Sequence, residues 1–480
     1  MKKFALSVSL VLALFYLQGC GSQNGSTSVT TTTSTTTSTT TPPTTTTTTL
    51  PTTTTVLSPA TLGTLTDIGD YLNAPGEEWF FASTKDVNST GKIIGESPGN
   101  RLVFWDPASP NVMTQIPAVG GFYDDYYNQK TAGGTNDFVA YEVLQINDAG
   151  LVIGNMYAGI DQSRGFVWNS TTNALIDLAP PNFINTTGDR EFSLYSKVVD
   201  INSAGEVLLT AEDSKGERRA YFWDGISYTT VNDLLTEASS AIPAINVPAL
   251  QPVPGILRAT GAEAVALNDT GQVVTATADD GVYFDFDING WAALGTLADA
   301  ATTIPIDINN NKHIVGISGN DGFFWAGGVM YPISNPSGDA VEVVDVNNND
   351  IVIGNSGGQA FVWSIDPVTG NGVFSAIGTL GGTTSTAVAI NDRDEIVGYS
   401  TTGVIYSEGN VTAAIVHGFL WKNLVMYDLG AHSPPNYIYP FDPDFYSSKV
   451  TSISESGIVT GKSYSINSHA RGFTLTPVFP

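Results

Sequence analysis

The sequence predicts an all-β fold, a single β-propeller of eight four-stranded blades that is closed by an N-terminal strand joining the last blade. Two observations lead to this prediction. A phrase that joins Ile-Asn or a close relative, a short polar turn and Val-Gly recurs from Val87 to the C-terminus. The chain also holds 49 glycines and only 14% charged residues, which is typical of many short strands and tight turns.

Each repeat contains four short strands. In residues 386–429 the strands read TAVAIN, EIVGYS, GFLWK and VMYDLG. The first two are joined by Asn391–Asp394, a polar loop of the kind that tolerates left-handed backbone and forms hydrogen bonds with its own side chains. The asparagine that opens this loop recurs along the chain. We predict a turn role for Asn88, Asn147, Asn202, Asn268, Asn309, Asn347 and Asn391.

The third strand of each repeat carries a large apolar residue at one fixed place. A residue of this kind once per repeat indicates packing between neighbouring units, and not a cofactor site. The residues at this place are Trp105, Trp168, Trp223, Phe284, Trp325, Trp363, Trp421 and Leu475.

The two ends of the repeat region distinguish a closed ring from an open stack. The repeats recur about every 52 residues, a spacing that both propellers and solenoids use. The last repeat stops after its third strand, at RGFTLTPVFP, while LGTLTDIGDYL from Leu62 resembles an isolated fourth strand. A borrowed strand removes exposed edges, whereas an open stack needs polar end caps that we do not find. We therefore expect residues near Leu62–Leu72 to close the ring.

One repeat is close to a known pattern. The stretch GTLGGTTSTAVAINDRDEIVGYS, followed by HGFLWKNLVMYDLG, resembles the HAF family of extracellular repeats. Other repeats depart from that pattern: Val207–Thr210 and Val273–Thr275 lack the glycine, and the repeat around Gly281 lacks the tryptophan. The resemblance implies a secreted or surface protein. It brings no defined activity and no catalytic residues, so function must come from what decorates the blades.

The N-terminus has the features of an export signal. Lys2 and Lys3 precede an apolar run of about 14 residues, which is too short to span a bilayer. The run ends in LQGC, which resembles the lipobox of bacterial lipoproteins, and Cys20 is the only cysteine of the chain. This resemblance implies that residues 1–19 are removed and that Cys20 is lipidated. Gly21, where retained lipoproteins carry aspartate, favours the outer membrane or cell surface.

Composition divides the rest of the chain in two. Residues 20–56 are rich in threonine and serine and predict a disordered stalk, because they cannot bury enough apolar surface to fold. Residues 57–480 form the predicted propeller, which lacks cysteine and so has no disulfide. The net charge of −27 disfavours nucleic acid and anionic membrane surfaces, since both require cationic contacts. The expected membrane contact is the lipid anchor alone.

No catalytic, metal or cofactor motif is convincing. Gly95–Gly99 matches G-x-S-x-G, but Pro98 lacks the N–H that such a site needs as an oxyanion donor. Asp285–Gly290 resembles the start of a calcium loop, but Thr296 replaces the bidentate glutamate, and a hairpin is the favoured interpretation. The four histidines fall in different repeats, without metal-ligand spacing. We expect no cofactor and no enzyme activity, although two-carboxylate hydrolysis stays open because the chain has 46 acidic residues.

The long segments between strands fall on one side of the predicted disc. They connect the fourth strand of one blade to the first strand of the next, at Pro117–Ala140, Ala179–Lys197, Leu235–Ala262 and Ala431–Lys449. A long loop at Thr401–Val416, between a second and a third strand, belongs to the same side. The turns between first and second strands are all short. The insertions therefore mark one face for function.

Two of these insertions are rich in aromatic and acidic residues. Tyrosine rings stack on ligands and carboxylates accept hydrogen bonds, so such surfaces suit a glycan or a protein partner. The alternative is that the rings pack beneath their own loops. The predicted binding residues are Tyr123, Asp124, Asp125, Tyr126, Tyr127, Tyr437, Tyr439, Phe441, Asp442, Asp444 and Tyr446.

Two hypotheses for function follow. The first is a lipid-anchored surface module that binds a glycan or protein through the insertion-bearing face. The second is an extracellular enzyme that acts on a polysaccharide through carboxylates on that face. The missing nucleophile motif and the family-like repeats favour the binding module.

Overall fold

The computed structural model describes most of the repeat region. Every element in the described part of the chain is a β-strand. The predicted signal peptide and Cys20 lie outside the described residues. The described residues are 55–57, 62–63, 65–68, 70–74, 77–80, 83–97, 101–110, 112–117, 140–157, 163–178, 183–184, 190–191, 195–212, 218–231, 263–277, 280–286, 290–408, 411–431, 446–464 and 470–479.

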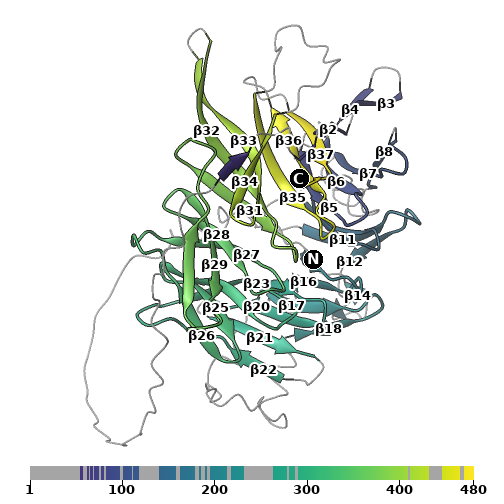
Figure 1. The fold of residues 1–480 in the computed structure, drawn as a ribbon. Coiled ribbons are helices and arrows are strands. Elements are labelled where there is room, and N and C mark those ends of the chain that lie inside the picture. The colour runs from purple at the N-terminus through teal and green to yellow at the C-terminus, as the bar shows by residue number, and fades with distance from the viewer. Residues whose placement is uncertain are drawn as a thin grey trace, which may run out of the picture.

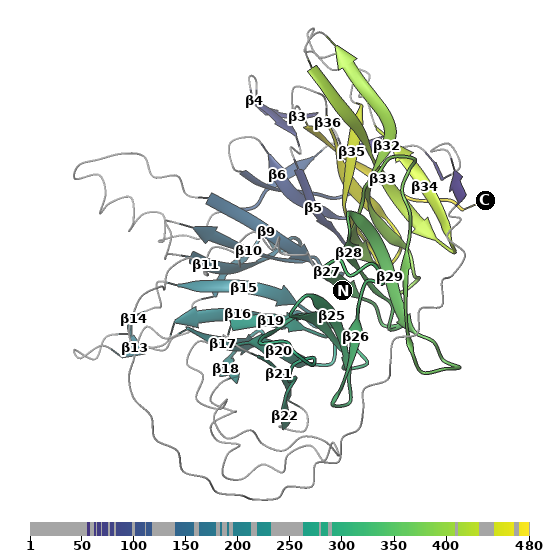
Figure 2. The same ribbon diagram turned by 90° about the vertical axis from the view of Figure 1, so that its left-hand side faces the viewer.

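Eight four-stranded antiparallel blades follow one another around a ring, as the sequence predicted (Figures 1 and 2). Blades 1 to 3 are β5 (Ser83–Val87), β6 (Ile93–Ser97), β7 (Arg101–Trp105) and β8 (Met113–Gln115); β9 (Ala140–Ile146), β10 (Leu151–Tyr157), β11 (Ser163–Asn169) and β12 (Leu175–Leu178); and β15 (Ser196–Ile201), β16 (Val207–Glu212), β17 (Arg218–Trp223) and β18 (Tyr228–Thr230).

Blades 4 to 7 have the same order, and the first strands of successive blades contact one another around the centre of the ring. They are β19 (Glu263–Leu267), β20 (Gln272–Ala276), β21 (Gly281–Asp285) and β22 (Gly290–Ala293); β23 (Thr303–Ile308), β24 (Ile314–Ser318), β25 (Asp321–Ala326) and β26 (Val329–Ile333); β27 (Val341–Val346), β28 (Val352–Ser356), β29 (Gln359–Ile365) and β30 (Gly372–Ala376); and β31 (Ser385–Ile390), β32 (Ile396–Glu408), β33 (Val411–Lys422) and β34 (Val425–Gly430).

Blade 8 combines the two ends of the propeller. It holds β35 (Ser447–Ile453), β36 (Val459–Tyr464) and β37 (Ala470–Leu475), and its fourth strand is β2 (Thr66–Asp67). β2 pairs antiparallel with β37, and the Leu62 carbonyl accepts the Val478 N–H at 2.9 Å. The predicted closure by the segment from Leu62 is therefore confirmed, with the paired residues at 66–67.

The hydrophobic core lies between blades. Eight clusters of buried side chains occupy the eight junctions, and each draws residues from two neighbouring blades. The predicted packing role of the tryptophans is confirmed: the rings of Trp168 and Phe104 meet at 5.3 Å, and those of Trp363 and Phe324 at 5.3 Å. Each of these two tryptophans thus packs against an aromatic ring of the preceding blade.

Three further pieces lie outside the four-stranded pattern. The short hairpins β3 (Asp70–Ala74) with β4 (Glu77–Phe80) and β13 (Phe183–Ile184) with β14 (Arg190–Glu191) form separate sheets. β1 (Thr55–Leu57) adds a fifth strand to blade 7 by pairing parallel with β34. β1 crosses the predicted boundary between stalk and propeller at residues 56 and 57.

The propeller has two unlike faces. The turn face carries the short turns between first and second strands and between third and fourth strands. The insertion face carries the connections between second and third strands and those between successive blades. Long connections leave this face between Gln115 and Ala140, Leu178 and Ser196, Thr230 and Glu263, and Gly430 and Ser447.

Candidate functional site

The turns of the turn face are shaped by the recurrent asparagines. In blade 1 the Oδ1 atom of Asn88 accepts hydrogen bonds from the Thr90 N–H (3.1 Å) and the Lys92 N–H (3.0 Å). Gly91 has φ +82°, a left-handed conformation that glycine adopts without steric cost. All seven asparagines begin such a turn and are at most 5% exposed, which confirms their predicted role.

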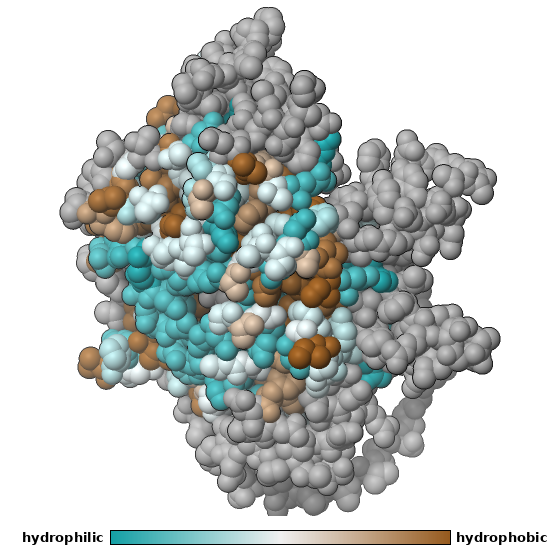
Figure 3. Space-filling model, turned by 90° about the vertical axis from the view of Figure 1, so that its right-hand side faces the viewer, coloured by the Kyte–Doolittle hydropathy of each residue, from teal (hydrophilic) through white to brown (hydrophobic). Residues whose placement is uncertain are grey.

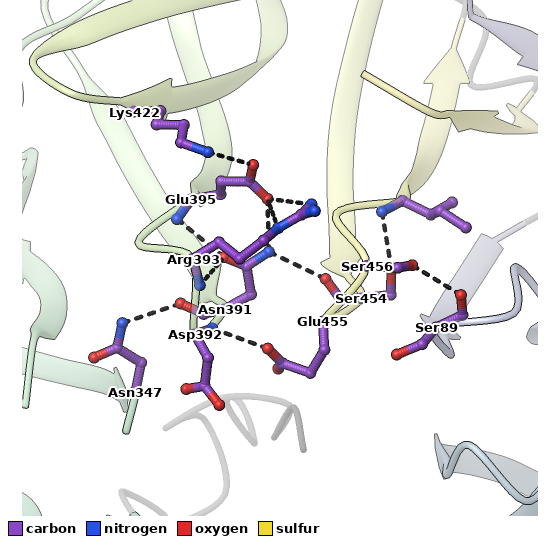
Figure 4. Close-up of polar contacts among 11 residues, drawn as sticks. Ser89, Asn347, Asn391, Asp392, Arg393, Glu395, Lys422, Ser454, Glu455 and Ser456 are labelled. Atoms are coloured by element: carbon purple, nitrogen blue, oxygen red, sulfur yellow. Dashed lines mark hydrogen bonds and ion pairs between the residues drawn. The ribbon is translucent and has the colours of Figure 1, made fainter. Parts of the chain in front are cut away.

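The same asparagines also join neighbouring blades. The side-chain N–H of Asn88 donates to the backbone carbonyl of Asn147 at 3.1 Å, and each later asparagine repeats this bond to the next blade. The series ends at Ser454, which replaces asparagine in blade 8, and the Ser456 hydroxyl closes the circle by donating to Ser89 (Figure 4). We call these eight linked turns the turn ring.

The residue after each asparagine adds a second circle of bonds. The Asn348 N–H donates to Oδ1 of Asp392 at 2.8 Å. The Asp392 N–H in turn donates to Oε2 of Glu455 at 2.9 Å (Figure 4). Equivalent bonds end on the carboxylates of Asp148 and Asp269. The acids of the turn ring therefore already accept backbone N–H groups of the preceding blade.

A small cavity of about 30 Å³, partly open to solvent, lies among the turns of blades 4 to 8. Its polar rim is formed by Asp269, Asn310, Asn348, Asp392 and Glu455. Burial acts to raise the pKa of Asp269, but hydrogen bonds from Ser203 and Asn310 outweigh it and lower the pKa. Within the described ranges, no three histidine, cysteine or acidic side chains are grouped to hold a metal ion. The rim is thus a structural element first.

A buried ion cluster supports the turn of blade 7. Glu395 is 1% exposed in its side chain and accepts hydrogen bonds from Lys422 (2.9 Å), Arg393 (2.8 Å) and Asn391 (2.7 Å), as Figure 4 shows. Burial acts to raise the pKa of Glu395, but the bonds from Asn391, Lys422 and Arg393 outweigh it and hold the pKa below its usual value. The carboxylate is therefore ionised and fixed.

On the insertion face, β32 and β33 project beyond their blade as a long hairpin (Figures 1 and 2). The sequence predicted a loop at Thr401–Val416. This prediction is wrong, because after an irregularity β32 and β33 pair again from Ile405↔Ala414 to Glu408↔Val411. The face on which the segment lies is as predicted. Val404 and Ile405, in the projecting part, are 55% and 58% exposed.

Tyr446 is the one predicted binding residue that the structure describes. It is partly buried, and its ring lies 4.5 Å from the ring of Tyr406 on the projecting hairpin. This contact places the end of one aromatic insertion against a second element of the insertion face. The remaining predicted binding residues, Tyr123 to Tyr127 and Tyr437 to Asp444, lie outside the described residues and stay predictions.

The rejected motifs are ordinary structure. Ser97, in the G-x-S-x-G match, lies within strand β6. The segment from Asp285 forms the hairpin that the sequence favoured, and Asp285 and Gly290 are the paired residues at its end. Asp285 is buried and accepts a bond from Lys312 of the next blade at 2.7 Å.

Three lysines near the insertion-face end of blade 8 and on the neighbouring strand β5 were missed by the sequence analysis. Lys449 and Lys462 are directly opposed on β35 and β36, and Lys85 lies on β5, which contacts both strands. Lys85 forms an ion pair with Glu96 at 3.3 Å. Aligning the repeats at the residue after Val-Gly would have singled out Lys462, because it is the only basic residue at this place, where blades 2 and 6 carry asparagine.

The apolar surface gives no strong indication of a site. In the view of Figure 3, hydrophilic residues form a broad band across the described surface, and hydrophobic residues occur in small groups between them. Within the described part of the chain, no helix is long and apolar enough to cross a membrane.

No protein-family model and no curated protein sequence matches this chain. The chain is similar to several solved structures at low identity. The Dos1 propeller is 10% identical, with 86% of this chain and 83% of that chain covered and a TM-score of 0.35. YCF48 bound to a D1 peptide is 9% identical (71% and 90%, TM-score 0.35), and a virginiamycin B lyase from Staphylococcus aureus is 12% identical (72% and 97%, TM-score 0.36). These similarities are too low to indicate an activity.

Proposed function

We propose that the chain is a lipid-anchored module of the bacterial cell surface that binds a glycan or a protein through its insertion face. The observation that supports this most directly is the contrast between the two faces. The turn face is tied into a continuous ring in which the side chain of each asparagine donates to the backbone carbonyl of the next turn. The long connections, the projecting hairpin and the Tyr406–Tyr446 contact all belong to the insertion face.

The direction of β1 supports the same conclusion. β34 runs from the turn face, where Asn423 and Leu424 connect it to β33, toward the insertion face. β1 is parallel to β34 and pairs Thr55 with Val425, so the chain enters β1 at the turn-face end. A tether that precedes β1 therefore reaches the propeller from the turn face. In a chain anchored through Cys20, the insertion face is directed away from the membrane.

A glycan array and a pull-down from envelope extracts test this function with the intact protein. We expect a bound ligand whose affinity falls about 5- to 150-fold for Tyr126→Ala and for Tyr439→Ala, as for interface contacts of about 1–3 kcal/mol each. Tyr331→Ala, on the outer strand of blade 5, is the control, and its affinity should not change. A large drop in melting temperature with unchanged affinity per folded molecule would assign the two rings to packing. Cleaved glycan products would instead favour the hydrolase.

A further inference from the structure

The lysines at the insertion-face end of blade 8 and on the neighbouring strand β5 are unusual in a chain with 46 acidic and 19 basic residues. Lys449 and Lys462 are direct cross-strand partners, which places like charges on the same face of one sheet. Among the described residues, the one ion pair of this group joins Lys85 to Glu96 at 3.3 Å. Three ammonium groups thus share a single carboxylate, and the local charge is opposite to that of the whole chain.

Corresponding positions in other blades show what Lys462 replaces. In blade 2, Asn155 occupies this place and bonds to both the N–H (2.8 Å) and the carbonyl (3.1 Å) of Val198 in the next blade. In blade 6, Asn355 accepts a bond from the Ala387 N–H at 2.8 Å. A lysine cannot accept a hydrogen bond from a backbone N–H. Blade 8, which carries Lys462 at this place, therefore lacks the hydrogen bond from the backbone N–H of the next blade.

The surroundings of Lys462 make its charge costly. Partial burial lowers the pKa of Lys462, and the charges of Lys449 and Lys85 lower it further, while Glu96 opposes them. The part of the chain that the structure describes offers Lys462 no ion pair within 4 Å. Lys449 lies over the ring of Tyr399 at 4.3 Å, a cation–π contact that leaves its donors free for a further partner.

One tyrosine contacts these lysines, and two others lie close to them along blade 8. Tyr399 lies beneath Lys449, and Tyr464 ends β36 two residues after Lys462. Tyr446, which contacts the projecting hairpin, precedes Lys449 by three residues. Tyrosine rings beside ammonium groups suit a sugar that carries a carboxylate, because the ring stacks on the sugar and the ammonium binds the charge.

We propose that Lys85, Lys449 and Lys462 form a binding site for the carboxylate of an acidic sugar, such as a uronic acid residue of an extracellular glycan. This assignment rests on the proposed binding function and names its ligand class. Three lysines and Glu96 leave an excess of two positive charges, and one carboxylate of the sugar reduces this excess to one. The net charge of −27 repels long polyanions, so the site favours sugars with few charges over densely charged chains.

Binding of trigalacturonate to the full-length protein tests the assignment by calorimetry, with its methyl ester as the uncharged probe. We expect trigalacturonate to bind at least tenfold more tightly than the ester, and less tightly as salt is added. Lys462→Asn introduces the side chain that blades 2 and 6 carry and should fold normally while weakening binding at least tenfold. Lys197→Gln is the matched control, because Lys197 takes the place of Lys449 in blade 3 but opposes Thr210.

The outcomes separate the site from the function. Equal affinity of Lys462→Asn and wild-type protein for trigalacturonate overturns the site, as does equal binding of the acid and the ester. If the array reveals a neutral glycan whose binding does not depend on Lys462, the site fails and the binding function stands. If an acidic peptide such as tetraglutamate binds more tightly than trigalacturonate, the sugar assignment is wrong. If no glycan or protein binds, both proposals fail.

Discussion

Removing one asparagine of the turn ring should measure how much the ring stabilises the propeller. Asn88 is 3% exposed and takes part in four hydrogen bonds, to the Thr90 N–H, the Thr90 hydroxyl, the Lys92 N–H and the Asn147 carbonyl. A net contribution of about 1 kcal/mol per bond gives about 4 kcal/mol. The hydroxyl of the exposed Thr90 regains a bond to water, which offsets about one of the four bonds, so we expect Asn88→Ala to cost about 3 kcal/mol.

Asn88→Ser is the matched control, because blade 8 already carries serine at this place. The hydroxyl of Ser454 accepts the Ile458 N–H at 2.9 Å, as the Asn88 side chain accepts the Lys92 N–H. The serine variant retains this turn bond and loses the bond to Asn147. We expect Asn88→Ser to cost about 1–2 kcal/mol, which is less than the alanine variant. Urea unfolding with an unchanged m-value measures both differences.

The results discriminate between the two roles of Asn88. If the alanine variant loses more stability than the serine variant, the difference between them measures the contribution of the turn bond. The loss that the serine variant shows measures the link between blades. An alanine variant that loses less than about 1 kcal/mol would refute the idea that the turn ring stabilises the fold. Equal losses for the two variants would refute the turn contribution.

Three other predictions concern the ends of the chain and a buried acid. Deleting Thr61–Leu72 removes β2 and should lower the melting temperature, and an unchanged melt would contradict closure of blade 8 by this strand. Because its bonding partners lower the pKa of Glu395 in the folded state, the ionised carboxylate stabilises the fold above pH 4.5, the ordinary pKa of glutamate. This stabilisation is lost as the pH falls through the folded-state pKa. Glu395→Gln should flatten stability over this range, and a parallel pH profile would contradict it. Cys20→Ala should release the protein from membranes, whereas continued palmitate labelling would exclude Cys20 as the anchor.

Sequence reasoning reached the fold because the propeller repeats its local chemistry. Asparagine with a left-handed residue three positions later specifies a turn within one repeat, and a large apolar residue in the third strand specifies packing. The same reasoning could not identify the partner of each asparagine side chain. The amide of Asn391 bonds to Ser454 of the next blade, and that partner is known only once the blades are placed in a ring.

The candidate site was harder to predict, because it depends on side chains from separate repeats. Lys449 and Lys462 become neighbours through strand register, and Lys85 joins them because blade 1 follows blade 8 in the closed ring. Aromatic and acidic composition singled out the insertions instead. Of those residues, Tyr446 is placed by the structure, and its contact with Tyr406 arises from a hairpin that the sequence suggested was a loop.

The position of β1 relates the fold to the proposed function. Parallel pairing with β34 makes the chain enter at the turn face, whereas antiparallel pairing would have brought it in across the insertion face. The segment from Cys20 to Thr55 can span at most about 120 Å when extended, at about 3.3–3.6 Å per residue. A ligand can therefore approach the insertion face without meeting the segment that precedes β1. In the proposed lipid-anchored protein, the turn ring, whose polar groups bond to one another, would be the face on the side of the tether.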